Sequence, residues 1–527
     1  MKKNLFASLL LLGIFIAGMT TGCKKFLDKQ PISTLSPVNY YKNDSEVESA
    51  LTGVYNILGL EFMWGGQIPI RHNASTDESF FSYTKFTSGP FLYNYDASDP
   101  TITSMWTYLY QGVERANVLL ANLDGAVIDS ARKSQVKGET LFLRAFYYFT
   151  LVQYWGDVPM KLSPSSSVNN VDIPRTSAKD VYAQILKDMQ TAEGLVNTAT
   201  ANGNTERISQ STVRGILARV CLTMAGAPLN DKAKYQDARD WAMKVMQSGI
   251  HELNPSYKQI FINECQDIDD FSECIWETGN WGNNNDANRI GGRIGNENGV
   301  KCSATDPANV GYAYGFNSTT IKLYKLYGAG DQRRDWAIST YTLSAAGAKT
   351  TLAATKIYDR NCAKWRREYE LLKPLNKNYT PTNFPILRYA DVLLMLAEAE
   401  NEVNGGPTAT AYESLNEVRR RGYGKPVHTP DPTVDTTGFD QSGFRQLIQD
   451  ERARELCFEG LRKPDLIRWG LFLTTMQSTA AEIAANGGTT YQYAAATAAR
   501  VSQRHLLYPI PSNEMSLNKA MVQNPGW

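Results

Sequence analysis

Apolar residues recur with a helical period over most of the chain, most clearly in the segment GETLFLRAFYYFTLVQYWGDVP. Its apolar stripe consists of Leu141, Ala145, Tyr148 and Val152, with three phenylalanines beside it. This stripe is wider than a surface helix needs, so we expect the helix to be buried on most sides. Gly156 follows the last apolar turn and Pro159 comes soon after, which predicts that the helix ends there.

The same pattern occurs in pairs. TVRGILARVCLTMAGAPL is followed by YQDARDWAMKVMQSG, and YADVLLMLAEAENEVNG is followed by TAYESLNEVRRRG. Two amphipathic helices joined by a short turn, with small residues at the contacts, are typical of tetratricopeptide-type units. No strict 34-residue period is visible, so we expect degenerate repeats in one mainly α-helical body.

The pattern changes between residues 261 and 385, where Gly, Asn, Thr and Tyr dominate. Turn-forming residues at this density predict a loop-rich insert with short strands rather than helices. Loops of this length inside a compact protein are usually either functional or disordered. The interspersed Trp281, Tyr312 and Tyr314 favour ordered loops.

The first residues form an export signal. Lys2 and Lys3 precede an apolar run of about fifteen residues, which is shorter than the ~20 residues that a membrane-spanning helix needs. Thr21 and Gly22 then directly precede Cys23, which resembles the lipobox of bacterial lipoproteins. This resemblance implies that residues 1–22 are removed and that the Cys23 thiol carries lipid. The alternative is an ordinary secretory signal followed by a chance cysteine.

Charge and cysteine content narrow the function classes. Without residues 1–22 the chain keeps 52 basic and 53 acidic residues, which argues against a nucleic-acid partner. Cys221 and Cys457 lie in half-apolar helical patterns and are interpreted as core residues. The other four, which could form disulfides outside the cytoplasm, are Cys265, Cys274, Cys302 and Cys362. The six thiols allow 15 connectivities, and no CxxC pair indicates a zinc site.

The sequence predicts no catalytic residue, metal or cofactor. The four histidines have no metal-binding spacing, and the chain contains no GxSxG, P-loop, HExxH or strand-linked GxGxxG motif. A carboxylate pair for glycoside hydrolysis stays open, because its separation is a three-dimensional quantity. Glu451, Glu455 and Glu459 recur every fourth residue and are expected on one helix face. Because arginines crowd this region, we favour a structural salt-bridge network over an acid/base pair.

Five blocks together carry a family resemblance. They are GETLFLRAFYYFTLVQYWGDVP, PRTSAKDVYAQILKDM, FPILRYADVLLMLAEAENE, ERARELCFEGLRKPDLIRWG and the C-terminal YPIPSNEMSLNKAMVQNPGW. In this order they resemble the SusD/RagB family of Bacteroidota over nearly the whole mature chain. Leu461 and Lys463-Pro464 depart from the His and aromatic residue that the family often has there. This corner is structural, so the departure puts packing rather than function in doubt.

The resemblance implies a non-catalytic outer-membrane lipoprotein that binds a nutrient, usually a glycan, at the cell surface. It also implies a partner, a SusC-like TonB-dependent transporter barrel on which the protein works as a lid. The expected organisation is a signal peptide (1–22), a lipid anchor and leader (23–40), an N-terminal helical region (41–260), a ligand-binding insert (261–385) and a C-terminal helical region (386–527). The alternatives are a surface glycoside hydrolase on a helical scaffold and a peptide-binding member of the same family.

A sugar site needs aromatic rings that stack on the apolar faces of pyranose rings, together with several polar partners for hydroxyl groups. Starch-binding members of the family place such aromatics just after a stretch similar to the TDE at residues 76–78. The candidate ligand-binding residues are therefore Phe81, Tyr83, Trp281, Asn283, Arg289, Tyr312 and Tyr314. Each of these aromatics could instead belong to the core. A shared role requires that the fold bring the insert over the segment after TDE.

Overall fold

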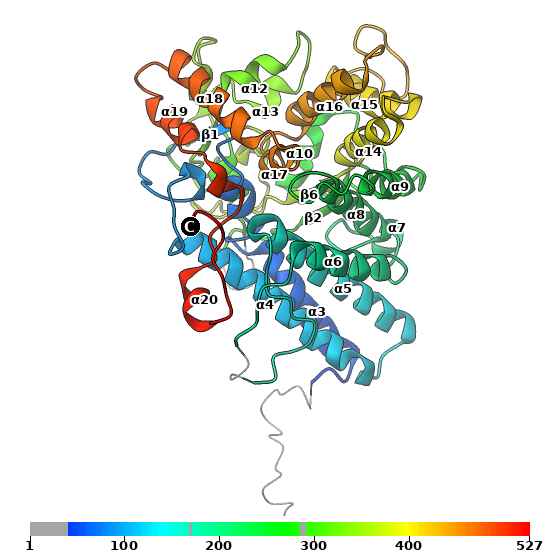
Figure 1. Ribbon diagram of the computed structural model, residues 1–527. Helices are drawn as coiled ribbons and strands as arrows, with labels where there is room; N and C mark the ends of the chain where they lie inside the picture. Colours follow the sequence, from blue (N-terminus) through cyan, green and yellow to red (C-terminus); the bar gives the residue numbers. More distant parts are fainter. Residues whose placement is uncertain (1–39, 168–170, 285–290) are drawn as a thin grey trace, which may run out of the picture.

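The computed structural model describes residues 40–167, 171–284 and 291–527 (Figure 1). The expected signal peptide, the expected lipid-bearing Cys23 and the candidate Arg289 lie outside the described residues. Within the described ranges, no helix is both long enough and apolar enough to cross a bilayer.

The described chain is mainly α-helical, as predicted. The longer helices are α3 (Asp44–Gly59), α4 (Pro100–Asn122), α5 (Ser130–Trp155), α6 (Ala178–Glu193), α8 (Gln210–Ala225), α9 (Lys234–Met246), α10 (Tyr257–Gln266), α14 (Tyr389–Asn404), α15 (Ala409–Gly422), α16 (Gln441–Leu456), α18 (Phe472–Asn486) and α19 (Gln492–Ala499). The shorter helices are α7 (Ala199–Asn202), α11 (Ile294–Asn298), α12 (Ile321–Leu326), α13 (Arg334–Ala337), α17 (Arg462–Arg468) and α20 (Ser512–Leu517). In Figure 1, α3, α4 and α5 run together in the lower part, and α14, α15 and α16 lie at the upper right.

Helix α5 is the buried helix that its wide apolar stripe predicts. It packs against α4 and α6, and nearly every residue of its second half is buried. Phe142 and Phe146 form T-shaped contacts with the Trp276 ring at 5.3 and 4.8 Å between ring centroids. The helix ends at Trp155, and Gly156 adopts a φ of 69°, a conformation that favours glycine.

The predicted helix pairs are confirmed, because α8 packs on α9 and α14 packs on α15. Helix α9 also packs on α14, which joins the two pairs. Ser209 caps α8 in a capping box with Thr212, and Thr408 caps α15. At Gly215 in α8 an added Cβ would lie 2.4 Å from Leu387, so glycine permits this close contact with the strand below.

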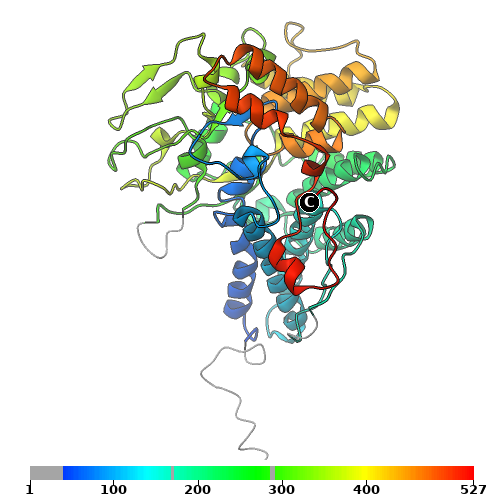
Figure 2. The same cartoon turned by 60° about the vertical axis from the view of Figure 1, so that its left-hand side comes forward.

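The strands are short and antiparallel, which confirms the prediction of short strands for the loop-rich insert. They pair as β1 (Ser79–Phe81) with β3 (Asn317–Thr319), β2 (Cys274–Thr278) with β6 (Phe384–Arg388), and β4 (Tyr341–Leu343) with β5 (Lys349–Thr351). In Figure 2 the loop-rich part, in green to yellow-green, lies on the left beside the blue N-terminal segment and the orange-red α18 and α19.

The two phenylalanines of β1 contact two separate aromatic groups. Phe80 packs against Tyr358, Tyr491 and Tyr493 at centroid distances of 5.9, 5.6 and 6.2 Å. The neighbouring Phe81 packs in a different group of phenylalanines. Successive side chains of a strand point to opposite faces, so the β1–β3 ribbon separates these groups.

The expected salt-bridge network exists, but its helix geometry differs from the prediction. Helix α16 ends at Leu456, so Glu459 lies in the turn beyond it rather than on the same helix face. We define the Glu455 network as Glu273, Arg333, Arg388, Arg421, Glu455 and Glu459, which are linked by buried ion pairs. Burial alone would raise the pKa of Glu455, but its arginine neighbours hold that pKa well below the usual range.

All six described cysteines are buried free thiols. Cys221 and Cys457 lie in the core as predicted. Cys265, Cys274, Cys302 and Cys362, which could have formed disulfides, are unpaired in the structure. Burial raises the pKa of Cys221 and of Cys457 to about 12, so neither thiol is activated as a nucleophile.

Candidate functional site

Three candidate tyrosines from two distant parts of the chain lie together. Tyr314 lies between the other two, with its ring centroid 5.8 Å from that of Tyr83 and 4.7 Å from that of Tyr312. The neighbouring rings are inclined at 71° and 69°. All three side chains are half-buried. We call Tyr83, Tyr312 and Tyr314 the tyrosine platform, which joins the segment after TDE to the loop-rich insert.

Phenylalanine side chains pack against the buried side of the tyrosine platform. Phe316 stacks on Tyr314 at 4.8 Å and lies 5.0 Å from Tyr83. The candidate Phe81 is only 2% exposed and packs against Phe91 and Phe316 at 4.1 and 4.9 Å. Phe81 therefore supports the rings above it and offers no free face in this structure.

The platform backbone is fixed from behind by buried polar groups. The carbonyl oxygen of Tyr312 accepts hydrogen bonds from Arg367 Nη1 at 2.7 Å and from Asn296 Nδ2 at 2.8 Å. The Tyr314 amide donates to the Asn296 carbonyl at 2.8 Å. A Cβ on Gly311 would lie 2.1 Å from Arg367 Cζ, so only glycine leaves room for this guanidinium. These contacts hold the main chain while the side chains of Tyr312 and Tyr314 remain partly exposed.

An arginine lies beside the aromatic rings. Arg71 Cζ is 5.4 Å from the Phe86 ring centroid and 5.8 Å from that of Phe316. Arg71 Nε and Nη2 donate to the two carboxylate oxygens of buried Glu297 at 3.0 and 2.6 Å. Arg293 shares the same carboxylate through its Nη2 at 3.1 Å. Arg71 Nη1 makes no hydrogen bond within the described part of the chain, and the Arg71 side chain is 13% exposed.

The remaining candidates follow in the segment before residue 285. Trp281 is 65% exposed, whereas Asn283 is buried and its Nδ2 donates to the Pro374 carbonyl oxygen. This contact ties residues 281–283 to the segment that contains Lys377, whose ammonium lies 5.5 Å from the Tyr312 ring centroid. Asn283 thus positions the loop, while Trp281 presents a large aromatic surface to solvent.

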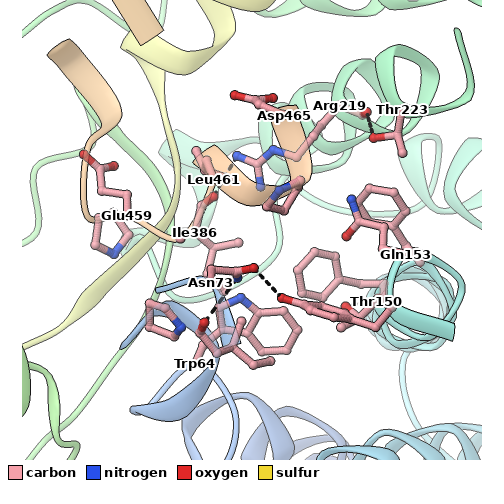
Figure 3. A pocket seen from close by; sticks show the side chains of 18 of the residues that line it. Trp64, Asn73, Thr150, Gln153, Arg219, Thr223, Ile386, Glu459, Leu461 and Asp465 are labelled. Carbon is pink, nitrogen blue, oxygen red and sulfur yellow. Dashed lines mark hydrogen bonds between the residues drawn. The ribbon is translucent and has the colours of Figure 1, made fainter. Parts of the chain in front are cut away.

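Two cavities of the described chain lie elsewhere and contain none of the candidate residues. The first, of about 70 Å³, lies between α5, α8 and α17 and is lined by residues such as Asn73, Gln153 and Arg219 (Figure 3). The second is a cleft of about 510 Å³ that includes Glu78 and Arg462. No group of three or more His, Cys, Asp or Glu side chains among the described residues could hold a metal ion.

Phe316, Phe86 and Arg71 also belong to this site and were not predicted from the sequence. Phe316 continues the spacing of Tyr312 and Tyr314 by two more residues, and alternate residues of an extended segment share a face. That signal could have found Phe316. Arg71 carries no comparable signal, because only the fold brings it beside a carboxylate 226 positions further along the chain.

Two family models match the chain. Residues 272–527 match the model described as SusD family, and residues 25–222 match a model described as starch-binding associating with outer membrane. The chain is similar to SusD-like protein P25 of Formosa agariphila, at 24% identity over 97% of both chains. It is also similar to the starch-binding protein SusD of Bacteroides thetaiotaomicron, at 23% identity over 86% of this chain and 84% of the relative.

Solved structures agree with these matches. A SusD homologue from Bacteroides thetaiotaomicron superimposes with a TM-score of 0.86 and 29% identity, over 93% of this chain and 98% of that protein. A laminarin-binding SusD-like protein has a TM-score of 0.69 and 24% identity, over 92% and 100% of the two chains, and supports the fold alone. The helix pairs, the loop-rich insert and both family models lead to one conclusion: the chain belongs to the SusD/RagB family.

Proposed function

We propose that this protein binds a glycan on the tyrosine platform and performs no chemistry on it. The observation that carries the proposal is the meeting of Tyr83, Tyr312 and Tyr314 in one partly exposed row. Aromatic rings stack on the apolar faces of sugar rings, while phenolic hydroxyls and Arg71 Nη1 offer hydrogen bonds to sugar hydroxyls. The relative named as a starch-binding protein and the family model described as starch-binding add support for a carbohydrate ligand.

The angles between the platform rings indicate which shape of ligand fits the site. Neighbouring platform rings are turned by about 70° from one another, so they form a stepped surface rather than a flat one. A flat crystalline polysaccharide would meet only one ring at a time. A soluble, twisted oligosaccharide chain could place successive sugar faces against successive rings, and we propose this ligand shape.

The site is tested by alanine substitution at the centre of the platform. Tyr314→Ala should weaken glycan binding by about 1–3 kcal/mol, the scale of one lost stacking contact. The measurement is calorimetry with glycans identified on an array. It uses a soluble protein from which the signal peptide and the leader have been removed. Tyr235→Ala is the matched control, because Tyr235 is also half-buried and has the Lys232 ammonium 5.4 Å from its ring centroid, but lies on α9.

Equal losses of glycan affinity in Tyr314→Ala and Tyr235→Ala would contradict the tyrosine platform as the binding site. Unchanged glycan affinity in Tyr314→Ala would indicate that the glycan binds to another surface of the protein. Release of new reducing ends that tracks the protein through chromatography would instead support the glycoside hydrolase.

We further propose that lipid on Cys23 anchors the protein at the outer membrane, where it delivers its ligand to a SusC-like TonB-dependent transporter. The lipobox-like sequence and the family model described as associating with outer membrane support this placement. Cys23→Ala should abolish acyl labelling and membrane partitioning. Mild detergent extraction of the wild-type protein should co-purify a large barrel protein, and recovery only as a free monomer in several detergents would contradict the partnership.

A further inference from the structure

Cationic side chains surround the tyrosine platform. The Lys85 ammonium lies 6.0 Å from the Tyr83 ring centroid, at one end of the row. The Lys377 ammonium lies 5.5 Å from the Tyr312 ring centroid, at the other end. Both lysines are exposed, and neither forms an ion pair with any described residue. The row of three rings therefore has an uncompensated positive charge at each end.

The carboxylates that pair with Arg71 and Arg293 do not cancel the charge of the two lysines. Glu297 is 1% exposed and already shared by Arg71 and Arg293. Glu61 lies 3.6 Å from Arg293 Nε and faces that guanidinium. Among the described residues, the four cationic groups Arg71, Arg293, Lys85 and Lys377 are thus set against the two carboxylates Glu61 and Glu297, and both carboxylates are directed at the arginines. The described side chains therefore leave positive charge in excess next to the platform rings.

We infer that the ligand of the tyrosine platform is an anionic glycan, whose carboxylate or sulfate groups lie against Lys85 and Lys377 while its sugar rings stack on the tyrosines. This inference rests on the proposed function and names its substrate class. A neutral glycan could accept hydrogen bonds from the two ammonium groups but would gain no attraction between opposite charges. An anionic glycan gains attraction at both ends of the row, and that attraction weakens as salt shortens the Debye length from ~10 Å at 0.1 M to ~3 Å at 1 M.

The test compares glycans that differ only in charge. An array carries uronate oligosaccharides with their neutral methyl esters, sulfated galactan oligosaccharides with their desulfated forms, and uncharged glucans. Calorimetry at low and high salt then measures the affinity of the best ligands for the wild type and for a double variant, Lys85→Gln with Lys377→Gln. Lys244→Gln is the control, because Lys244 is also exposed and its ammonium lies 3.9 Å from the Trp241 ring centroid, but both residues lie on α9.

We expect charged forms to bind better than their neutral partners, with affinity that falls as salt rises. The double variant should lose about three- to tenfold in affinity and part of the salt dependence, as for two exposed ion pairs. Lys244→Gln should match the wild type. A preference for free uronates over their methyl esters, or for sulfated over desulfated galactans, decides which anion is recognised.

Two outcomes would overturn the inference and keep the proposed function. One is tightest binding of a neutral glycan that Tyr314→Ala weakens and the lysine variant does not. The other is binding of charged glycans with equal affinity by wild type and double variant. Absence of binding to every glycan would overturn the inference and the proposed function together.

Discussion

The Glu455 network and the tyrosine platform use charged and aromatic residues in opposite ways. In the network, Arg388 is 1% exposed and is satisfied by Glu273, Glu455 and Glu459. At the platform, Lys85 and Lys377 lie in solvent next to rings and have no carboxylate partner among the described residues. Compensated charge inside the protein stabilises one conformation. Uncompensated charge at the surface is left for a ligand.

The comparison predicts its largest effect at Arg388. Arg388→Met should lower the free energy of unfolding by about 3–5 kcal/mol, because it leaves buried carboxylates without their partner. Thermal and denaturant unfolding measure the loss. Arg334→Met is the control, since Arg334 pairs with Asp335 at the surface, where ion pairs contribute about 0–1 kcal/mol. Similar losses of unfolding free energy in Arg388→Met and Arg334→Met would contradict the view that buried, compensated charge stabilises the protein more than surface charge.

Glu78 sharpens the comparison, because it is buried without an arginine of its own. Arg462 pairs with the adjacent Asp77 at 2.9 and 2.7 Å, and burial raises the pKa of Glu78 to about 8. The folded protein therefore keeps this proton while the unfolded chain releases it above about pH 4.5. The contribution of Glu78 to stability should be full below that pH and fall by up to about 4 kcal/mol as pH rises to 8. Glu78→Gln should remove this fall in chemical unfolding measured from pH 5 to 8, and parallel curves for the two proteins would refute the assignment.

Gly311 tests whether the platform depends on the buried groups behind it. Gly311→Ala places a methyl group against the Arg367 guanidinium and should cost about 1–3 kcal/mol of stability, together with a loss of glycan affinity. Gly53→Ala is the control, because that helical position has open space and should gain about 0.5–1 kcal/mol. Unchanged affinity in a destabilised Gly311→Ala protein would separate the platform from its support.

The smallest expected effect on stability concerns Trp281. Trp281→Ala should leave the melting temperature nearly unchanged, because the side chain is 65% exposed. If Trp281 contacts the ligand, affinity should fall by about 1–3 kcal/mol, which calorimetry on the same variant measures. A core role predicts the reverse pattern, a loss of about 3–5 kcal/mol in stability. Untouched binding would remove Trp281 from the site.

The helices were predictable because periodic apolar residues and terminal glycines are local signals. The stripe of α5 and its end at Gly156 are examples. The site was only partly predictable, because exposure of an aromatic residue depends on tertiary packing. Phe81 and Tyr83 are separated by one residue, yet Phe81 is buried and Tyr83 is half-exposed. The arginine partners of Glu455 were missed for the same reason, since Arg333 and Arg388 lie 122 and 67 positions away.

The hydrogen bonds of Asn296 and Arg367 behind residues 312–314 have a consequence for how this binding surface can change. They attach to main-chain atoms, which every residue type has, and not to the tyrosine rings. Exchange of the side chain at 312 or 314 therefore leaves the clamp and its geometry in place. The fold provides a fixed frame with replaceable side chains, so an evolving or engineered protein of this kind could acquire a new ligand preference through a few outward substitutions without first gaining stability elsewhere.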